Sequence, residues 1–261
     1  MQKVSKKFHE LWNYREMFQG LVSREIRARY KGSFLGFFWS LLNPLLMMAI
    51  YSIVFSHVMR VQIPHYSLHL LAGLLPWTWF TTSISNSTGS IVANSNLIKK
   101  IYFPNEILPL VSVTTNLVNY LLSVPILLGF MVFQQVPFTS ALLVLPLLLV
   151  IQFILSLGFG LILATLNVYF RDVEQLLGVV LMAWFYLTPI IYPLSFVPER
   201  YQGLAMLNPM AGLIVSYQRI FMEGSLPHVL HLLYPLGFGL ALLMVGYAIF
   251  VWRKYDFAEL V

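Results

Sequence analysis

The sequence contains no cysteine and very little charge. The missing cysteine excludes a disulfide framework, thiol chemistry and any cysteine-ligated metal. Charged residues make up 10% of the 261 residues, against roughly 25% in an ordinary soluble domain, whereas 59% of the residues are hydrophobic. So few charges cannot cover the surface of a soluble globule, and so many apolar residues exclude a disordered chain. We therefore expect a protein whose solvent is lipid.

Several functional signatures are also missing. The phosphate-binding pattern G-x-x-x-x-G-K-[ST] does not occur, which excludes ATP hydrolysis of that type. No acidic residue lies deep in an apolar stretch, which argues against an ion-coupled carrier. His57, His65 and His69 have no carboxylate nearby, so we expect no metal site. We expect no catalytic residue and no cofactor in this chain, and transport would need energy from another subunit.

The uncharged stretches predict six transmembrane helices, because about 20 apolar residues cross a bilayer. These helices lie near residues 34–55, 68–92, 108–133, 140–167, 175–192 and 229–252. A polar turn at Gln134 and Gln135, followed by Pro137, separates the third helix from the fourth. The fold class is therefore all-α, a polytopic membrane protein with one transmembrane domain over residues 33–255.

The basic residues predict the orientation of this domain. All Lys and Arg residues except Arg60, Arg200 and Arg219 fall on one side of the six helices. Basic loops remain in the cytoplasm, so both termini are expected there. The net charge of +6 then reflects membrane orientation, and no nucleic-acid binding is expected.

Residues 1–32 are expected to form a cytoplasmic amphipathic helix at the membrane interface. Over residues 6–31, apolar side chains such as Phe18 and Leu21 recur at three- and four-residue steps, with basic residues largely between them. Gly20 marks a possible bend. This helix either anchors the chain on the membrane or forms a docking surface for a cytoplasmic partner.

The loop between the second and third spans, residues 94–104, carries more apolar residues than a connecting hairpin needs. Asn96 is a candidate cap for a short helix that must end before Pro104. Tyr102 and Phe103 either contact a partner or lie in the lipid headgroup belt.

The external segment 196–224 is apolar but interrupted by several Pro and Gly residues. We expect two short re-entrant helices there, near 199–206 and 210–222. One further full span is the alternative, which Arg219 in mid-segment and the charge bias oppose.

Polar and aromatic residues suggest a translocation path. The second span is rich in Ser, Thr and Asn, whereas Ser156, Gly160 and Ala164 form a small-residue stripe typical of helix packing. Arg171 and Asp172 are either part of a gate or a helix-end arrangement. Aromatic rings suit the faces of sugars, although interface anchoring is the simpler explanation. The candidate channel or gate residues are Asn86, Trp77, Arg171, Asp172, Trp184, Tyr186, Tyr192, Phe196, Tyr201 and Tyr217.

Several motifs together resemble the ABC-2 type exporter permeases, over nearly the whole chain. They are Arg29-Tyr30-Lys31-Gly32-Ser33-Phe34-Leu35-Gly36, Trp39-Ser40-Leu41-Leu42-Asn43-Pro44-Leu45, the 96–104 segment with Glu106-Ile107-Leu108-Pro109, Tyr169-Phe170-Arg171-Asp172-Val173, Thr188-Pro189-Ile190-Ile191-Tyr192-Pro193 and Leu207-Asn208-Pro209. The closest branch exports O-antigen polysaccharide, capsule or teichoic acid.

The resemblance implies a homodimer in the bacterial cytoplasmic (inner) membrane, paired with two copies of a separate subunit that binds ATP and Mg. It implies a polysaccharide on a polyprenyl diphosphate lipid as the substrate. The coupling helix that seats in the ATPase would then comprise residues 94–104, with contacts from Asn96, Leu97, Lys99, Lys100, Ile101, Tyr102, Phe103 and Pro104. The alternatives are an exporter of teichoic acid, a drug or a small lipid, and a membrane glycosyl- or acyltransferase, for which grouped acidic or histidine residues are missing.

Overall fold

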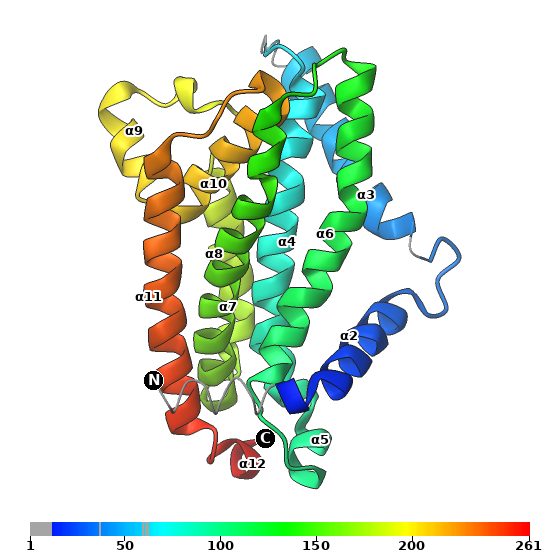
Figure 1. The fold of residues 1–261 in the computed structure, drawn as a ribbon, viewed down its shortest axis with the longest axis vertical. Coiled ribbons are helices and arrows are strands. Elements are labelled where there is room, and N and C mark those ends of the chain that lie inside the picture. Colours follow the sequence, from blue (N-terminus) through cyan, green and yellow to red (C-terminus); the bar gives the residue numbers. More distant parts are fainter. Residues whose placement is uncertain (1–11, 37, 59, 61–62) are drawn as a thin grey trace.

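The structure is a computed structural model that describes residues 12–36, 38–58, 60 and 63–261 (Figure 1). Every regular element in these ranges is helical, which confirms the predicted all-α class. The longer elements are α2 (Arg15–Tyr30), α3 (Phe38–Ser52), α4 (Tyr66–Ala93), α6 (Ile107–Phe133), α7 (Leu145–Tyr169), α8 (Asp172–Tyr186), α10 (Pro209–Gln218) and α11 (Val229–Arg253). The shorter ones are η1 (Ile53–Val58), α5 (Ser95–Lys100), η2 (Ser140–Val144), η3 (Leu194–Phe196), α9 (Glu199–Met206), η4 (Arg219–Glu223) and α12 (Phe257–Leu260).

Helices α4, α6, α7 and α11 run side by side along the long axis of the molecule (Figure 1). Within the described residues, three helical stretches are long and apolar enough to cross a membrane: α6, η2 with α7, and α11. Helix α4 is 28 residues long, about 42 Å at 1.5 Å per residue, but its Ser, Thr and Asn residues lower its hydropathy. Helices α3 and α8 have 15 residues each, about 22 Å of helix against a hydrocarbon core of about 30 Å.

Two predicted helices have other bounds in the structure. Helix α8 begins at Asp172 and ends at Tyr186, whereas 175–192 was expected. Thr188 precedes Pro189, and a residue before proline is biased away from the helical conformation. The expected helix over 94–104 is helical only at Ser95–Lys100, and its C-cap, Ile101, is already extended.

The amphipathic N-terminal element is also organised differently. Residues 1–11 lie outside the described part of the chain. Residues 12 and 13 are helical, and a turn at Tyr14 separates them from α2. A bend was expected at Gly20, but α2 continues through this residue without interruption. Leu21 is buried and contributes to a cluster with residues of the transmembrane helices, so one face of α2 packs on the bundle.

Small residues bring the central helices into backbone contact. Ser156, Gly160 and Ala164 of α7 are all buried, which confirms the packing role of this stripe. A Cβ atom added to Gly160 would lie 2.9 Å from Ser87 Cβ on α4. On the other side of α7, a Cβ on Gly158 would lie 2.8 Å from the backbone nitrogen of Leu243. Such distances leave room for glycine only, so α7 is held tightly between α4 and α11.

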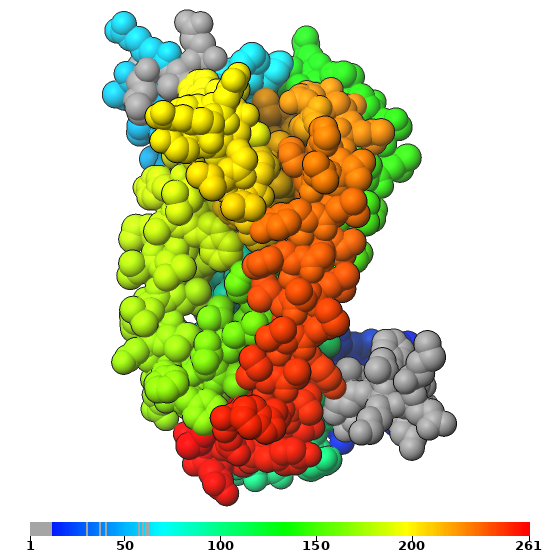
Figure 2. Space-filling view, turned by 90° about the vertical axis from the view of Figure 1, so that its left-hand side faces the viewer, coloured from blue at the N-terminus to red at the C-terminus, as the bar shows by residue number. Residues whose placement is uncertain are grey.

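The two ends of the bundle carry different structures. Helices α9 and α10 occupy the ranges where re-entrant helices were expected, and they lie at the end opposite α5 and α12 (Figure 1). Figure 2 shows α9 in yellow across one end of the molecule, beside the first turns of α11. A large buried cluster joins this end to the middle of the bundle, and a smaller one lies at the end of α5 and α12.

Candidate functional site

The segment that follows α4 is held by both ends of the chain. Asn94 forms the junction between α4 and α5, where its side-chain amide donates to the Ser90 carbonyl at 2.9 Å. Arg24 of α2 donates to Asn94 Oδ1 at 2.9 Å. Asn94 occupies the N-cap position of α5, although its side chain makes no capping hydrogen bond, and the assignment of this position to Asn96 was wrong. The contact with Arg24 fixes α2 beside the start of α5.

The two aromatic residues of this segment point to different environments. Tyr102 is 86% exposed, while Phe103 is 5% exposed and belongs to the buried cluster with Ile107 and Phe257. Side chains alternate sides along extended backbone, so neighbours face opposite ways. The prediction that Phe103 lies on a contact surface is therefore corrected: it anchors the segment. Tyr102 presents its ring outward, next to the exposed residues Lys99, Lys100 and Ile101.

The C-terminal segment completes this surface, which sequence reasoning missed. Lys254 Nζ lies 3.7 Å from Glu106 Oε1, and the rings of Phe250 and Phe257 are 5.1 Å apart. Residues 98–105 together with Lys254, Tyr255 and Ala258 line a cavity of about 360 Å³. The signal in the sequence was the return of apolar residues at Phe257 and Leu260 after the charges that end the last span.

At the opposite end, Asn208 connects α9 and α10 to α8. Its side-chain oxygen accepts hydrogen bonds from Trp184 Nε1 at 2.8 Å and from the Met210 backbone at 3.0 Å. Its amide donates to Thr188 Oγ1 at 2.8 Å, and that hydroxyl donates to the Trp184 carbonyl at 2.8 Å. This closed arrangement makes the end of α8 and the α9–α10 turn one structural unit.

The ten candidate channel residues divide into exposed and buried groups. Tyr217 and Trp77 are buried inside the protomer. Tyr217 packs 6.1 Å from the ring of Tyr120, and Trp77 packs against Phe80 and Trp184. Neither lines a path on the surface of this chain, so the two assignments are corrected: they are core aromatics.

The remaining candidates retain the exposure that a path needs, to different degrees. Tyr186, Phe196 and Tyr201 are exposed toward the end that carries α9, and Trp184 and Tyr192 are half-buried. Tyr192 Oη donates to the Tyr186 carbonyl at 2.9 Å, which orders the turn after α8. Nearer the end that carries α5, Asn86 of α4 and the pair Arg171 and Asp172 at the start of α8 are exposed.

Comparison with known proteins decides the family. The ABC-2 type transporter family matches residues 16–222. The chain belongs to the ABC-2 type transporter family. The match covers almost all of α2 and every helix from α3 to α10 in one continuous range. The ABC-2 family consists of transporter membrane subunits.

Relatives of this ABC-2 protein match almost end to end. The O-antigen export system permease protein RfbA of Myxococcus xanthus is 41% identical over 253 residues, which is 96% of this chain and 97% of the relative. The protein of the same name from Klebsiella pneumoniae is 40% identical, over 92% of this chain and 93% of the relative. The polysialic acid transport protein KpsM of Escherichia coli is 27% identical, over 90% of this chain and 93% of the relative.

Proposed function

We propose that this protein is the membrane subunit of an ATP-driven exporter that moves an O-antigen-like, lipid-linked polysaccharide across the bacterial cytoplasmic membrane. The observation that carries the proposal is the identity of about 40% to O-antigen export permeases over more than nine-tenths of both chains. The 27% identity to a polysialic acid transport protein makes capsule export the more distant relation. No observation favours teichoic acid, drugs or small lipids.

The energy would come from a separate ATP-binding subunit, present in two copies and holding ATP and Mg. Its contact on this chain would be the coupling surface, which we define as Lys99, Lys100, Ile101 and Tyr102. This surface joins two cationic side chains to exposed apolar and aromatic area, a combination that surface residues in water seldom show without a partner. Tyr14 Oη donates to the Tyr102 carbonyl at 3.4 Å, which supports the segment from the side of α2.

Two copies of the chain would form the translocation path between them. The outer side of α8 exposes Leu176, Val179 and Met182, an apolar strip suited to lipid or a second copy. Tyr186, Phe196 and Tyr201 continue from α8 to the external helices, and aromatic rings offer flat apolar faces to successive sugars. We infer that these three residues, rather than Trp77 or Tyr217, lie along the path.

The proposed topology has six spans and both termini in the cytoplasm, and the absence of cysteine makes it testable. A single cysteine at Leu204, which is exposed on α9, should react with a membrane-impermeant maleimide applied outside intact cells. A matched cysteine at Ile101 should react only after the cytoplasmic side is opened. The reverse pattern would contradict the topology.

The function itself is tested by reconstitution with the ATP-binding subunit in proteoliposomes. A lipid-linked O-antigen glycan should become accessible to an impermeant glycosidase on the opposite side only when ATP is present. Tyr102→Ala should abolish this movement while the protein inserts normally, because its side chain carries little packing. Movement without ATP, or stimulation of ATPase activity by drugs but not by the glycan, would overturn the proposal.

A further inference from the structure

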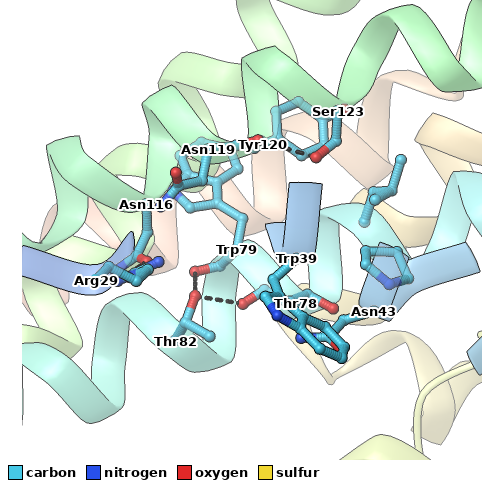
Figure 3. A pocket seen from close by; sticks show the side chains of 12 residues that line it. Arg29, Trp39, Asn43, Thr78, Trp79, Thr82, Asn116, Asn119, Tyr120 and Ser123 are labelled. Carbon is cyan, nitrogen blue, oxygen red and sulfur yellow. Dashed lines mark hydrogen bonds between the residues drawn. The ribbon is translucent and has the colours of Figure 1, made fainter. Parts of the chain in front are cut away.

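A cavity of about 280 Å³, with a largely apolar wall that also carries several amide and hydroxyl side chains, lies where the end of α2 meets α3, α4 and α6 (Figure 3). It is separate from the coupling surface and from the exposed aromatic residues at the external end. Small-molecule sites commonly measure roughly 300–1,000 Å³, so this cavity suits a headgroup rather than a polymer. Among the described residues that line it, Arg29 is the only one with a charge.

The guanidinium of Arg29 is positioned by a relay of hydrogen bonds. Arg29 Nη2 donates to Asn116 Oδ1 at 3.0 Å, and Asn116 Nδ2 donates to the Ser112 carbonyl at 2.8 Å. Since the Asn116 amide is fixed by its own helix, the cation is held against α6. The Glu25 carboxylate also attracts the Arg29 guanidinium through a charge–charge interaction. The side chain remains exposed, and a guanidinium has five N–H donors in a fork that matches phosphate oxygens.

The other walls supply neutral groups of the kind that bind phosphate and sugar. Asn43 of α3 and Thr78 of α4 are exposed toward the cavity, and Asn119 of α6 is half-buried (Figure 3). Behind them, the rings of Trp79 and Tyr120 stack with centroids 5.4 Å apart, forming a rigid wall. The indole of Trp39 is partly exposed at the edge. Amide and hydroxyl donors beside a cation favour an anion, and an indole face favours a sugar ring.

An apolar track leads away from the cavity. Asn43, Met47 and Ile50 lie at four- and three-residue steps on α3, so they share one face of the helix. Met47 and Ile50 are exposed. A molecule with its anionic group at Arg29 and Asn43 can therefore lay a hydrocarbon chain along α3. The cation and the apolar track side by side favour an amphiphile over a free anion, because a free anion would make no contact with the track.

We propose that this cavity binds the diphosphate that joins a polyprenyl chain to its glycan, with Arg29 contacting the phosphate and α3 contacting the lipid. The proposal rests on the proposed function and assigns its substrate a first binding site inside each protomer. Asn43, Thr78 and Asn119 would contact the diphosphate or the sugar next to it. The cavity would thus select substrates by the linkage that all of them share, whatever the repeating unit of the glycan.

The test measures binding of farnesyl diphosphate, a short soluble polyprenyl diphosphate, to the full chain in nanodiscs. Farnesol and inorganic pyrophosphate are the competitors. We expect saturable binding that neither competitor displaces at equal concentration. Displacement by pyrophosphate would show that the site reads a free diphosphate and would overturn the lipid assignment. Displacement by farnesol would overturn the role of the anion.

Variants connect the binding to the cavity. Arg29→Ala should weaken binding about tenfold or more, because a charged hydrogen bond contributes roughly that factor. Arg29→Lys should restore only part of it, since the ammonium lacks the fork. Arg27→Ala is the matched control: Arg27 is exposed on the same helix and its Nε donates to the Ser23 carbonyl at 3.3 Å, outside the cavity. Arg27→Ala should bind as the wild type does.

A second variant keeps the test decisive if Arg29→Ala fails to fold. Asn43→Asp preserves size at an exposed position and introduces a negative charge, so it should abolish binding. Equal affinity in wild type, Arg29→Ala and Asn43→Asp would refute the site, as would an equal loss in Arg27→Ala. If the site is refuted in this way but the protein still exports polysaccharide, the proposed function stands. If binding is lost in Arg29→Ala and Asn43→Asp as expected, but the wild type exports no polysaccharide, the proposed function alone is contradicted.

Discussion

Tyr102 and Phe103 are neighbours in sequence, yet alanine substitutions should affect different properties: stability at Phe103, and partner binding and transport at Tyr102. Phe103 is 5% exposed and belongs to the buried cluster at the end of α5 and α12. A buried aromatic side chain removes on the order of 150–250 Å² from water. At ~25 cal/mol per Å² this corresponds to about 4–6 kcal/mol, an upper bound because the unfolded chain is not fully extended. We expect Phe103→Ala to cost about 3–5 kcal/mol.

Tyr102→Ala removes a side chain that is 86% exposed, so its effect on stability should stay within about 0.5 kcal/mol. Its backbone carbonyl, which accepts the hydrogen bond from Tyr14, is unchanged by the substitution. The loss should appear instead in co-purification with the ATP-binding subunit and in transport. Phe103→Leu is the control, because it retains much of the apolar volume and should recover most of the stability.

The assay is thermal unfolding of the purified proteins in detergent, followed by tryptophan fluorescence, alongside ATPase co-purification. Phe103→Ala should have a clearly lower melting temperature than the wild type. Tyr102→Ala should have the wild-type melting temperature but should co-purify with less of the ATP-binding subunit. The separation between anchor and contact residue would be refuted by a wild-type melting temperature for Phe103→Ala. A large drop for Tyr102→Ala would refute it equally.

Three further predictions concern other parts of the molecule. Gly158→Val should lower the stability measured by thermal unfolding by roughly 1–3 kcal/mol, because even its Cβ atom would lie 2.8 Å from the Leu243 nitrogen on α11. Gly129→Ala is the control and should be tolerated, because its Cβ atom would have nothing within 4 Å. Asn208→Ala removes contacts with Trp184, Thr188 and the Met210 backbone, each worth about 1 kcal/mol, so protease cleavage in the external segment should increase; unchanged cleavage would contradict the linking role of Asn208. Burial raises the pKa of Glu25 above its ordinary value of 4.5, against the influence of Thr115, Arg29 and Arg24, so the folded state holds this proton more tightly than the unfolded chain. Its contribution to stability should be complete below about pH 4.5 and decline as pH rises toward the raised pKa; Glu25→Gln should abolish that part of the pH dependence of the melting temperature.

The sequence predicted well those features that depend on local composition. Uncharged stretches located the apolar helices, because charge is costly in lipid and marks the start of α6 at Glu106 and the end of α11 at Arg253. Proline placed the starts of α9 and α10, which follow Pro198 and begin at Pro209, whereas the interrupting residues Gly203 and Gly212 lie inside these helices. The small residues of α7 indicated close packing, which the contact of Gly160 with Ser87 confirms.

Features that depend on contacts distant in sequence could not be predicted. In the sequence, Trp77 and Tyr217 look like the other aromatic residues, and only the approach of α10 to α4 and α6 buries Tyr217. Whether Tyr102 or Phe103 faces inward depends on where α5 ends, and moving that end by one residue would exchange them. The cavity around Arg29 combines four helices, so no single stretch of sequence reveals it.

The backbone contact between α7 and α11 has a consequence for how force travels through the protein. A Cβ on Gly246 would lie 2.9 Å from the Gly158 carbonyl oxygen, so no layer of side chains separates the two helices there and sliding requires them to part. Interiors packed in this way transmit strain rather than absorb it. Helix α11 leads directly into Lys254 and α12, which contact Glu106 and Phe103 beside the proposed coupling surface. If a partner moves that surface, we expect α7 and α11 to respond as a pair, with relative movement at the more loosely packed helices α3 and α8.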